Sequence, residues 1–320
     1  MNRLLRLAAC GCLAAGLASG VAHAQGAKEV RIAVVTHGQA SDPYWSVVKR
    51  GVDDGAKMTG AKVEYNAPDT FDMVQMAHMI DAAVASRPDG LVVSVPDEAA
   101  LHDSITRAIQ AGIPVISIDA GEEAAKRMGV TLFVGSESSY KAGQVAGQRL
   151  LKDHVLKVVC VNQEVGNTSL DDRCRGITDV LKPQGGSTDV LAVTMDPTDV
   201  TSRAQAYLSS HPDIQGVVAL GASTVGDPLV GLFRQRGLFG KVGLYTFDIS
   251  PTTLEAVARK QMGFALDAQE YLQGFYPVVT LYERALYGFW PTSDIRTGPR
   301  VIDEPAQAEK VLEMSKLGVR

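Results

Sequence analysis

Short apolar runs alternate with segments of helical periodicity along most of the chain. The run Val30–Val35 is rich in β-branched residues, and apolar side chains then recur every three or four positions between 43 and 58. This pattern predicts a strand that leads into a helix. The same succession repeats to residue 118, where 91–93 and 114–118 are the continuous apolar runs typical of buried parallel strands. The first part therefore predicts a doubly wound α/β unit with helices on both faces of a parallel sheet.

The alternation starts again after residues 131–134, which predicts a second α/β unit. A helix over 140–151 and a strand over 155–161 begin this unit, and it continues to a strand at 242–247. No segment rich in Pro, Gly or Ser separates the halves, so strands rather than a flexible linker are expected to join them. A helix over 271–287 and the apolar pair Val301–Ile302 must then be shared between the units. We predict one lobe from 28–134 plus about 269–297, and another from 135–268 plus about 298–320.

The first 24 residues have the pattern of a cleaved secretory signal. Arg3 and Arg6 precede an apolar stretch over 7–21, and Ala22–Ala24 supplies small residues before Gln25. The stretch is shorter than the roughly 20 residues of a membrane-spanning helix. Lipidation at Cys10 is the alternative interpretation, because 7–10 resembles a lipobox. The signal predicts export to the periplasm.

The charge balance is acidic, which argues against nucleic acid as a partner. The full chain has 31 basic and 36 acidic residues and a formal net charge of -5. Removal of Arg3 and Arg6 with the signal leaves 29 basic residues against 36 acidic ones, or -7. No basic stripe of the kind that binds nucleic acid is therefore expected.

Two cysteines, Cys160 and Cys174, remain after the signal is removed. An even number in an oxidising compartment predicts one disulfide, and two separate buried thiols are the alternative. The six histidines are scattered, with no His-Glu-x-x-His or Cys-x-x-Cys, so no metal site is predicted. No glycine-rich phosphate-binding motif follows the first strand, and in Gly221–Gly226 the second glycine comes one residue too late for a nucleophile elbow. We expect neither an enzyme nor a cofactor.

Polar side chains gather where the predicted strands end, which is where open α/β sheets bind ligands. Carboxylates and amides hold hydroxyl groups, and an aromatic face such as that of Tyr44 or Trp45 covers the apolar side of a sugar ring. Alternatively, Asp42, Asp97 and Asp119 are helix caps or turn residues, and Trp45 belongs to the core. The polar strand ends are 36–45, 94–97, Asp119, 162–164, 221–223, Asp248 and 267–269.

Five short pieces of sequence follow one another in a specific order. They are Asp42–Trp45, Gly112–Ile116 leading to Asp119, Arg173–Gly176, His211–Asp213 and Phe247–Asp248. Together they resemble the type I periplasmic sugar-binding proteins, the ribose-binding-protein-like components of ABC importers, over about residues 28–303. The resemblance implies two similar lobes joined by three crossovers, which close around a sugar or sugar alcohol. It also implies a monomer that delivers its ligand to an ABC permease, with a chemoreceptor or histidine kinase as the alternative partner.

The resemblance also implies the ligand contacts, position by position. The chain departs from its relatives in having Ala120 where many have Arg, Gly221–Ala222 where Asn-Asp is common, and Asp42 where ribose binders have Asn. Ribose is therefore no more favoured than another pentose, a hexose or a polyol. Asp267 or Gln269 is expected to replace the missing amide. The expected ligand-binding residues are Asp42, Tyr44, Trp45, Asp119, Arg175, Asp248, Asp267 and Gln269.

Overall fold

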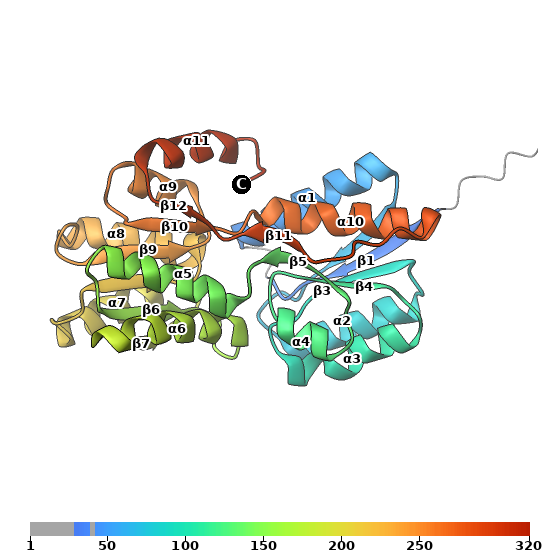
Figure 1. Cartoon of the computed structure of the whole chain (residues 1–320), viewed down its shortest axis with the longest axis horizontal. Helices are drawn as coiled ribbons and strands as arrows, with labels where there is room; N and C mark the ends of the chain where they lie inside the picture. Colours follow the sequence, from blue (N-terminus) through green and yellow to red (C-terminus); the bar gives the residue numbers. More distant parts are fainter. Residues whose placement is uncertain (1–28, 39–41) are drawn as a thin grey trace, which may run out of the picture.

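The chain forms two α/β lobes that lie end to end, as the computed structural model shows for residues 29–38 and 42–320 (Figure 1). The predicted signal at 1–24 and Cys10 lie outside the described residues. Each lobe has a six-stranded sheet covered by helices on both faces. The predicted fold class, two doubly wound lobes joined by three crossovers, is confirmed.

The first lobe has an all-parallel sheet in the order β11-β5-β4-β3-β1-β2. Side chains of β1 alternate between its faces: Ile32 and Val34 pack against α1 and α10, whereas Ala33 and Val35 pack against α2 and α3. The strands are β1 (Arg31–Val35), β2 (Lys62–Asn66), β3 (Gly90–Ser94), β4 (Val115–Ile118), β5 (Leu132–Ser136) and β11 (Ile295–Gly298). The helices are α1 (Pro43–Thr59), α2 (Met73–Ala85), α3 (Glu98–Gln110), α4 (Glu122–Arg127) and α10 (Glu270–Tyr287).

The second lobe repeats this arrangement in the order β12-β10-β9-β8-β6-β7, with only β12 antiparallel to its neighbour. Its strands are β6 (Lys157–Asn162), β7 (Ser187–Ala192), β8 (Gly216–Ala219), β9 (Gly243–Phe247), β10 (Phe264–Asp267) and β12 (Arg300–Ile302). Its helices are α5 (Ser139–Lys152), α6 (Thr168–Leu181), α7 (Pro197–Ser210), α8 (Asp227–Arg236), α9 (Pro251–Ala258) and α11 (Pro305–Ser315).

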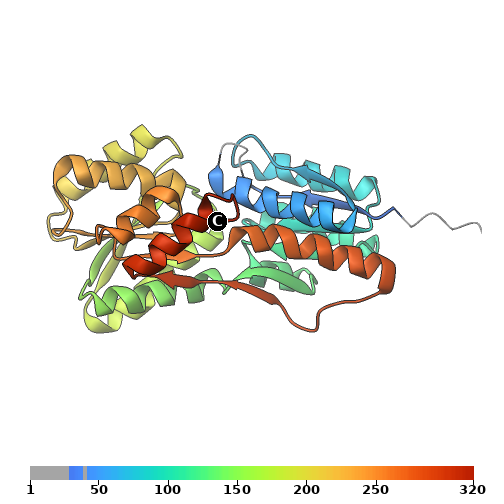
Figure 2. The same ribbon diagram turned by 90° about the horizontal axis from the view of Figure 1, so that it is seen from above.

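The chain passes between the lobes three times. It leaves the first sheet after β5 to begin α5, returns after β10 to begin α10, and leaves again between β11 and β12. As a result α10, which follows the second lobe in sequence, lies beside α1 on the first lobe (Figure 2). The three connections run close together: the Glu137 N–H donates to the Gly298 carbonyl at 2.8 Å, and the Thr297 hydroxyl donates to the Ala268 carbonyl at 2.6 Å. This arrangement lets two lobes rotate about a common hinge.

Glycine allows two helix pairs to approach unusually closely. A Cβ at Gly51 of α1 would lie 2.0 Å from the Tyr271 carbonyl oxygen of α10, and one at Gly274 would lie 2.0 Å from that of Val48. The second lobe has the same close helix contact at a glycine: a Cβ at Gly143 of α5 would lie 2.2 Å from the Arg173 carbonyl oxygen of α6. The absence of a side chain therefore fixes how α1 and α6 sit relative to their neighbours.

The two cysteines lie together in the core of the second lobe, in β6 and α6. Both are buried, and their thiols are close enough to share a hydrogen bond. No bond joins the two sulfurs in the structure, and the disulfide stays a prediction. Burial and a hydrogen bond with Cys174 raise the pKa of the Cys160 thiol well above its usual range. The protonated form is the less reactive one, and both side chains act here as small apolar residues.

Within the described part of the chain, no helix combines the length and the apolar character needed to cross a lipid bilayer.

Candidate ligand-binding site

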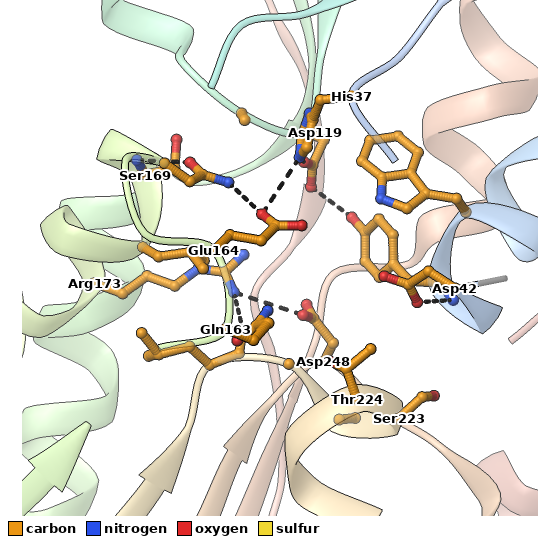
Figure 3. A pocket seen from close by; sticks show the side chains of 18 of the residues that line it. His37, Asp42, Asp119, Gln163, Glu164, Ser169, Arg173, Ser223, Thr224 and Asp248 are labelled. Atoms are coloured by element: carbon orange, nitrogen blue, oxygen red, sulfur yellow. Dashed lines mark hydrogen bonds and ion pairs between the residues drawn. The ribbon is translucent and has the colours of Figure 1, made fainter. Parts of the chain in front are cut away.

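A cleft between the two lobes collects polar and aromatic side chains from both (Figure 3). The space between its walls amounts to about 550 Å³, part of which is open solvent. The cleft lies at the carboxyl ends of both sheets, where ligands bind to this class of fold. Its lining includes His37, Asp42, Tyr44, Trp45 and Asp119 of the first lobe, and Gln163, Glu164, Asn167, Arg173, Ser223, Thr224 and Asp248 of the second.

Asp42 both caps helix α1 and lines the cleft. Its carboxylate accepts a hydrogen bond of 3.0 Å from the Tyr44 backbone N–H, and Pro43 takes the first helical position. Burial raises the pKa of Asp42 to about 7, against the lowering effect of that hydrogen bond. The carboxylates of Glu164, Asp248 and Asp119 contribute to this rise. The capping and the binding interpretations of Asp42 are thus compatible.

Tyr44 and Asp119 form a polar pair on the first-lobe wall. The Tyr44 hydroxyl donates a 2.6 Å hydrogen bond to Oδ1 of Asp119, which follows β4. Burial and the negative charge of Asp119 raise the pKa of Tyr44 well above its usual range, so the hydroxyl stays protonated. The bond fixes one oxygen of Asp119 and leaves the other, Oδ2, directed toward His37 (Figure 3).

His37 and Trp45 form the aromatic part of the cleft. The ring of His37 meets that of Trp45 edge to face, with centroids 4.8 Å apart, and its Nδ1 shares a 2.7 Å hydrogen bond with the Ser94 hydroxyl. Trp45 is 95% buried and belongs to the core beneath α1, so its indole both packs in this core and lines the cleft. An indole face in this position suits the apolar side of a sugar ring.

His37 also reaches across to the second lobe. Its Nε2 lies 4.0 Å from Asp119 Oδ2 and 3.8 Å from Oε2 of Glu164, which comes from the loop after β6. The same Glu164 oxygen accepts a 2.7 Å hydrogen bond from the Asn167 side chain, and Asn167 caps helix α6. The cleft therefore brings carboxylates of both lobes to one imidazole.

Arg173 of α6 lies at the base of the second-lobe wall. Its guanidinium is 3.5 Å from Asp248 Oδ2, donates a 2.9 Å hydrogen bond to the Leu220 carbonyl and lies 4.8 Å from the centre of the Phe247 ring. Burial raises the pKa of Asp248 to about 6, although Arg173 opposes this. The Arg173 Nε has no hydrogen-bond partner and is buried, so it is free to donate to a bound molecule.

The structure places five of the eight expected contacts around the cleft and three elsewhere. Asp42, Tyr44, Trp45, Asp119 and Asp248 line it. Arg175, Asp267 and Gln269 do not. Asp267 is fully buried and pairs with the Arg320 side chain, and the Gln269 amide donates to the Thr297 carbonyl, so both serve the connection between the lobes.

The arginine that lines the cleft is Arg173 and not the expected Arg175. Arg175 is exposed, pairs with Asp172 at 2.7 Å and lies over the Tyr140 ring in a separate groove. Two residues correspond to about 200° around a helix, so the two arginines point to opposite sides. The sequence carried a signal for this: Arg173 is three or four positions from the apolar Leu170 and Ile177, which places it on the buried side of α6.

Sequence reasoning also did not single out His37, Gln163, Glu164 or Asn167. The first three lie within the polar strand ends, two or fewer residues beyond β1 and β6. Their position after matching strands of the two sheets was the available signal. Among the described residues, no group of three or more His, Cys, Asp or Glu side chains is arranged to hold a metal ion.

The lobes already touch at the rim of the cleft. Thr168 at the start of α6 donates from its backbone N–H and its hydroxyl to the Pro96 carbonyl of the first lobe, at 3.1 and 3.0 Å. The Ser169 hydroxyl accepts a 3.1 Å hydrogen bond from the Gly121 N–H. These contacts close one side of the cleft.

Comparison with known proteins gives one family. The family model described as periplasmic binding protein domain matches residues 32–287. A solved structure described as a carbohydrate transporter from Acidothermus cellulolyticus 11B, in complex with myo-inositol, is 27% identical with a TM-score of 0.84. The similarity covers 91% of this chain and all of that one.

Two curated relatives are similar in sequence. The xylose/arabinose-binding protein of Sulfolobus acidocaldarius is 27% identical over 79% of this chain and 65% of its own length. The D-ribose/D-allose-binding protein of Pseudomonas aeruginosa is 25% identical over 71% of this chain and 73% of its own. The chain thus spans slightly less than two thirds of the first relative and more of the second.

Proposed function

Because the chain belongs to the periplasmic binding protein family, as the resemblance predicted, we propose that it captures a sugar or sugar alcohol between its lobes and delivers it to an ABC transporter permease. Proteins of this family bind solutes and do not transform them, and this chain is a binding protein rather than an enzyme. The proposal includes removal of residues 1–24, a periplasmic location and a monomeric state.

The observation that carries this proposal is the composition of the cleft. Carboxylates from both lobes, Asp119 and Asp248, lie near an indole, Trp45, and a buried guanidinium, Arg173. Carboxylate and guanidinium groups each bind two adjacent hydroxyls, while the indole covers an apolar ring face. The names of the relatives, which refer to xylose, arabinose, ribose and allose, and the myo-inositol complex support the same class of ligand.

The proposed mechanism is closure about the three connections between the lobes. A ligand that bridges Asp119 on one wall and Arg173 with Asp248 on the other makes all its contacts only when the cleft is shut. Such a ligand shifts the population toward the closed form, whose surface then differs from that of the open form. A permease that recognises the closed form takes up only loaded protein.

A thermal-shift screen of the purified protein against pentoses, hexoses and polyols tests the binding. A ligand at about 100 times its Kd stabilises the native state by about 2.7 kcal/mol, so we expect a rise in Tm of several degrees for at least one compound. No rise with any of them, repeated by calorimetric titration, would overturn the proposal. Loss of uptake of the identified compound in a gene-deletion strain tests the delivery step.

A further inference from the structure

The charges that line the cleft do not balance. Four carboxylates, Asp42, Asp119, Glu164 and Asp248, face a single guanidinium, that of Arg173, among the described lining residues. With His37 neutral, the formal charge is four negative and one positive, or -3. The surrounding hydroxyls and amides donate hydrogen bonds but carry no charge that could offset this.

Arg173 is already engaged by one carboxylate. It lies 3.5 Å from Asp248, and its other contacts are the Leu220 carbonyl and the Phe247 ring. The partners of the other three carboxylates are neutral: the Tyr44 N–H for Asp42, the Tyr44 hydroxyl for Asp119 and the Asn167 amide for Glu164. A protonated His37, between Asp119 and Glu164, would offset one charge and leave two.

Near the cleft, burial and neighbouring carboxylates disfavour an ionised carboxyl. Glu270, at the start of α10, is buried, and neither of its carboxylate oxygens has a hydrogen-bond partner. Burial raises its pKa well above the usual range, and Asp267 and Asp248 add to this, while Arg320 opposes it. Arg320 is itself paired with Asp267. The raised pKa of Asp42 has the same origin in burial and neighbouring carboxylates.

We propose that the ligand of this cleft is a sugar or polyol that carries a protonated amino group, held among Asp42, Asp119 and Glu164. A neutral sugar would leave these carboxylates buried and unbalanced once the cleft closes, which is costly in a site shielded from water. An ammonium group offers three donors and one positive charge, and charge-assisted hydrogen bonds are the stronger kind. Trp45 and Tyr44 add aromatic surface of the sort that attracts cations.

This inference rests on the proposed function and narrows its ligand class. Arg173, Gln163 and Thr224 remain available at the opposite side of the cleft to bind hydroxyl groups. The site would therefore still recognise the hydroxylated ring of a sugar or cyclitol. The amino group adds what the hydroxyl contacts lack, a charge opposite to that of the first-lobe wall.

The test compares compounds that differ only in replacing one hydroxyl by an amine. Calorimetric titration at pH 7.5 would use D-glucosamine with D-glucose, D-galactosamine with D-galactose, and an amino-deoxy-inositol with myo-inositol. We expect the aminated member of at least one pair to bind about tenfold or more tightly than its hydroxyl counterpart, a difference typical of one added charge pair.

The substitution Asp42→Asn removes one charge and keeps the helix cap, because Asn caps as well as Asp. It should reduce that preference by about fivefold or more while changing the affinity for the hydroxyl member less. Asp53→Asn is the matched control: Asp53 lies on the same helix, is exposed and pairs with Lys49. It should leave the preference unchanged.

Each outcome decides between the two proposals. Binding of hydroxyl compounds with equal or greater affinity in every pair would overturn the amino-group inference and leave sugar binding in place. A preference unaltered by Asp42→Asn would also overturn it. Failure of every compound to bind, including those of the wider screen, would overturn both.

Discussion

Asp119 and Asp248 occupy equivalent positions in the two lobes. Each follows the third strand in the spatial order of its sheet, β4 or β9, and each has a left-handed backbone, with φ of 60° and 62°. Left-handed conformations are uncommon outside glycine but more accessible to Asp, and they turn both carboxylates into the cleft. His37 and Glu164 correspond in the same way, each two residues beyond β1 or β6. The cleft is thus made by two matching sheet edges that face each other.

The choice between the two arginines of α6 is the first prediction. Arg173→Ala should weaken binding of the identified ligand by about 30-fold or more, because loss of a buried charge partner costs about 2–5 kcal/mol. Arg175→Ala should change affinity less than about twofold, since its partners are Asp172 and the Tyr140 ring outside the cleft. Calorimetric titration measures both.

Thermal melting of the same two variants separates binding from folding. Arg173→Ala also leaves Asp248 without its charge partner, so some loss of stability is expected. Equal losses of affinity in the two variants would contradict the placement of Arg173 in the site.

Trp45 is expected to report the ligand. Its indole lines the cleft, whereas the other tryptophan, Trp290, lies at a distance from it with Arg284 4.5 Å from its ring centre. A ligand-induced change in fluorescence should therefore disappear in Trp45→Phe and persist in Trp290→Phe. Persistence of the change in Trp45→Phe would place the indole in the core alone.

The sequence predicted the elements with strong periodicity and missed the weak ones. The predicted strand 30–35 and helix 43–58 agree with Arg31–Val35 and Pro43–Thr59, because continuous β-branched runs and helical spacing are clear signals there. α4 has only six residues and β10 only four, too few for a periodic pattern to stand out.

The site was predictable in outline and not in detail. The ends of the predicted strands indicated which edge of each sheet binds the ligand, and five of the eight residues expected there do line the cleft. The side of α6 that faces the cleft depends on helix phase, and the resemblance placed the arginine contact at Arg175, on the opposite side of the helix from Arg173. Asp267 also ends a strand, yet its carboxylate is taken by Arg320, some 50 residues away in sequence and not inferable from local pattern.

Close packing of α1 on α10 should be sensitive to a single methyl group. Gly51→Ala would place a Cβ 2.0 Å from the Tyr271 carbonyl oxygen, and such overpacking costs about 1–3 kcal/mol. Gly231→Ala is the matched control: Gly231 lies in α8, and a Cβ there would meet nothing within 4 Å. Urea unfolding should show Gly51→Ala destabilised and Gly231→Ala unchanged or more stable. Equal midpoints in the two variants would contradict this packing.

The raised pKa of Asp42 predicts a specific dependence of stability on pH. Its folded-state pKa is about 7, against about 3.9 in an unfolded chain, so between these values the folded protein binds more protons. This carboxyl therefore lowers stability as the pH rises from about 4 to 7. Asp42→Asn cannot ionise and should raise the Tm of the ligand-free protein at pH 8, and raise it less at pH 5.

Differential scanning calorimetry at the two pH values measures this effect, with Asp53→Asn as the exposed control. Burial also raises the pKa of Asp248 and Asp227 to about 6. Part of the loss of stability with rising pH should therefore remain in Asp42→Asn. A Tm shift of the same size at both pH values would show that ionisation of Asp42 is not its cause.

The return of the chain to the first lobe has a consequence for the order in which the protein is assembled. The sheet of that lobe is completed by β11, at Ile295–Gly298, and one of its faces is covered by α10, which begins at Glu270. A chain produced from its amino end therefore exposes the apolar face of β1 and β3 until most of the second lobe has been made. The second lobe needs only β12 and α11 to finish, so the two lobes mature almost together, at the very end of synthesis.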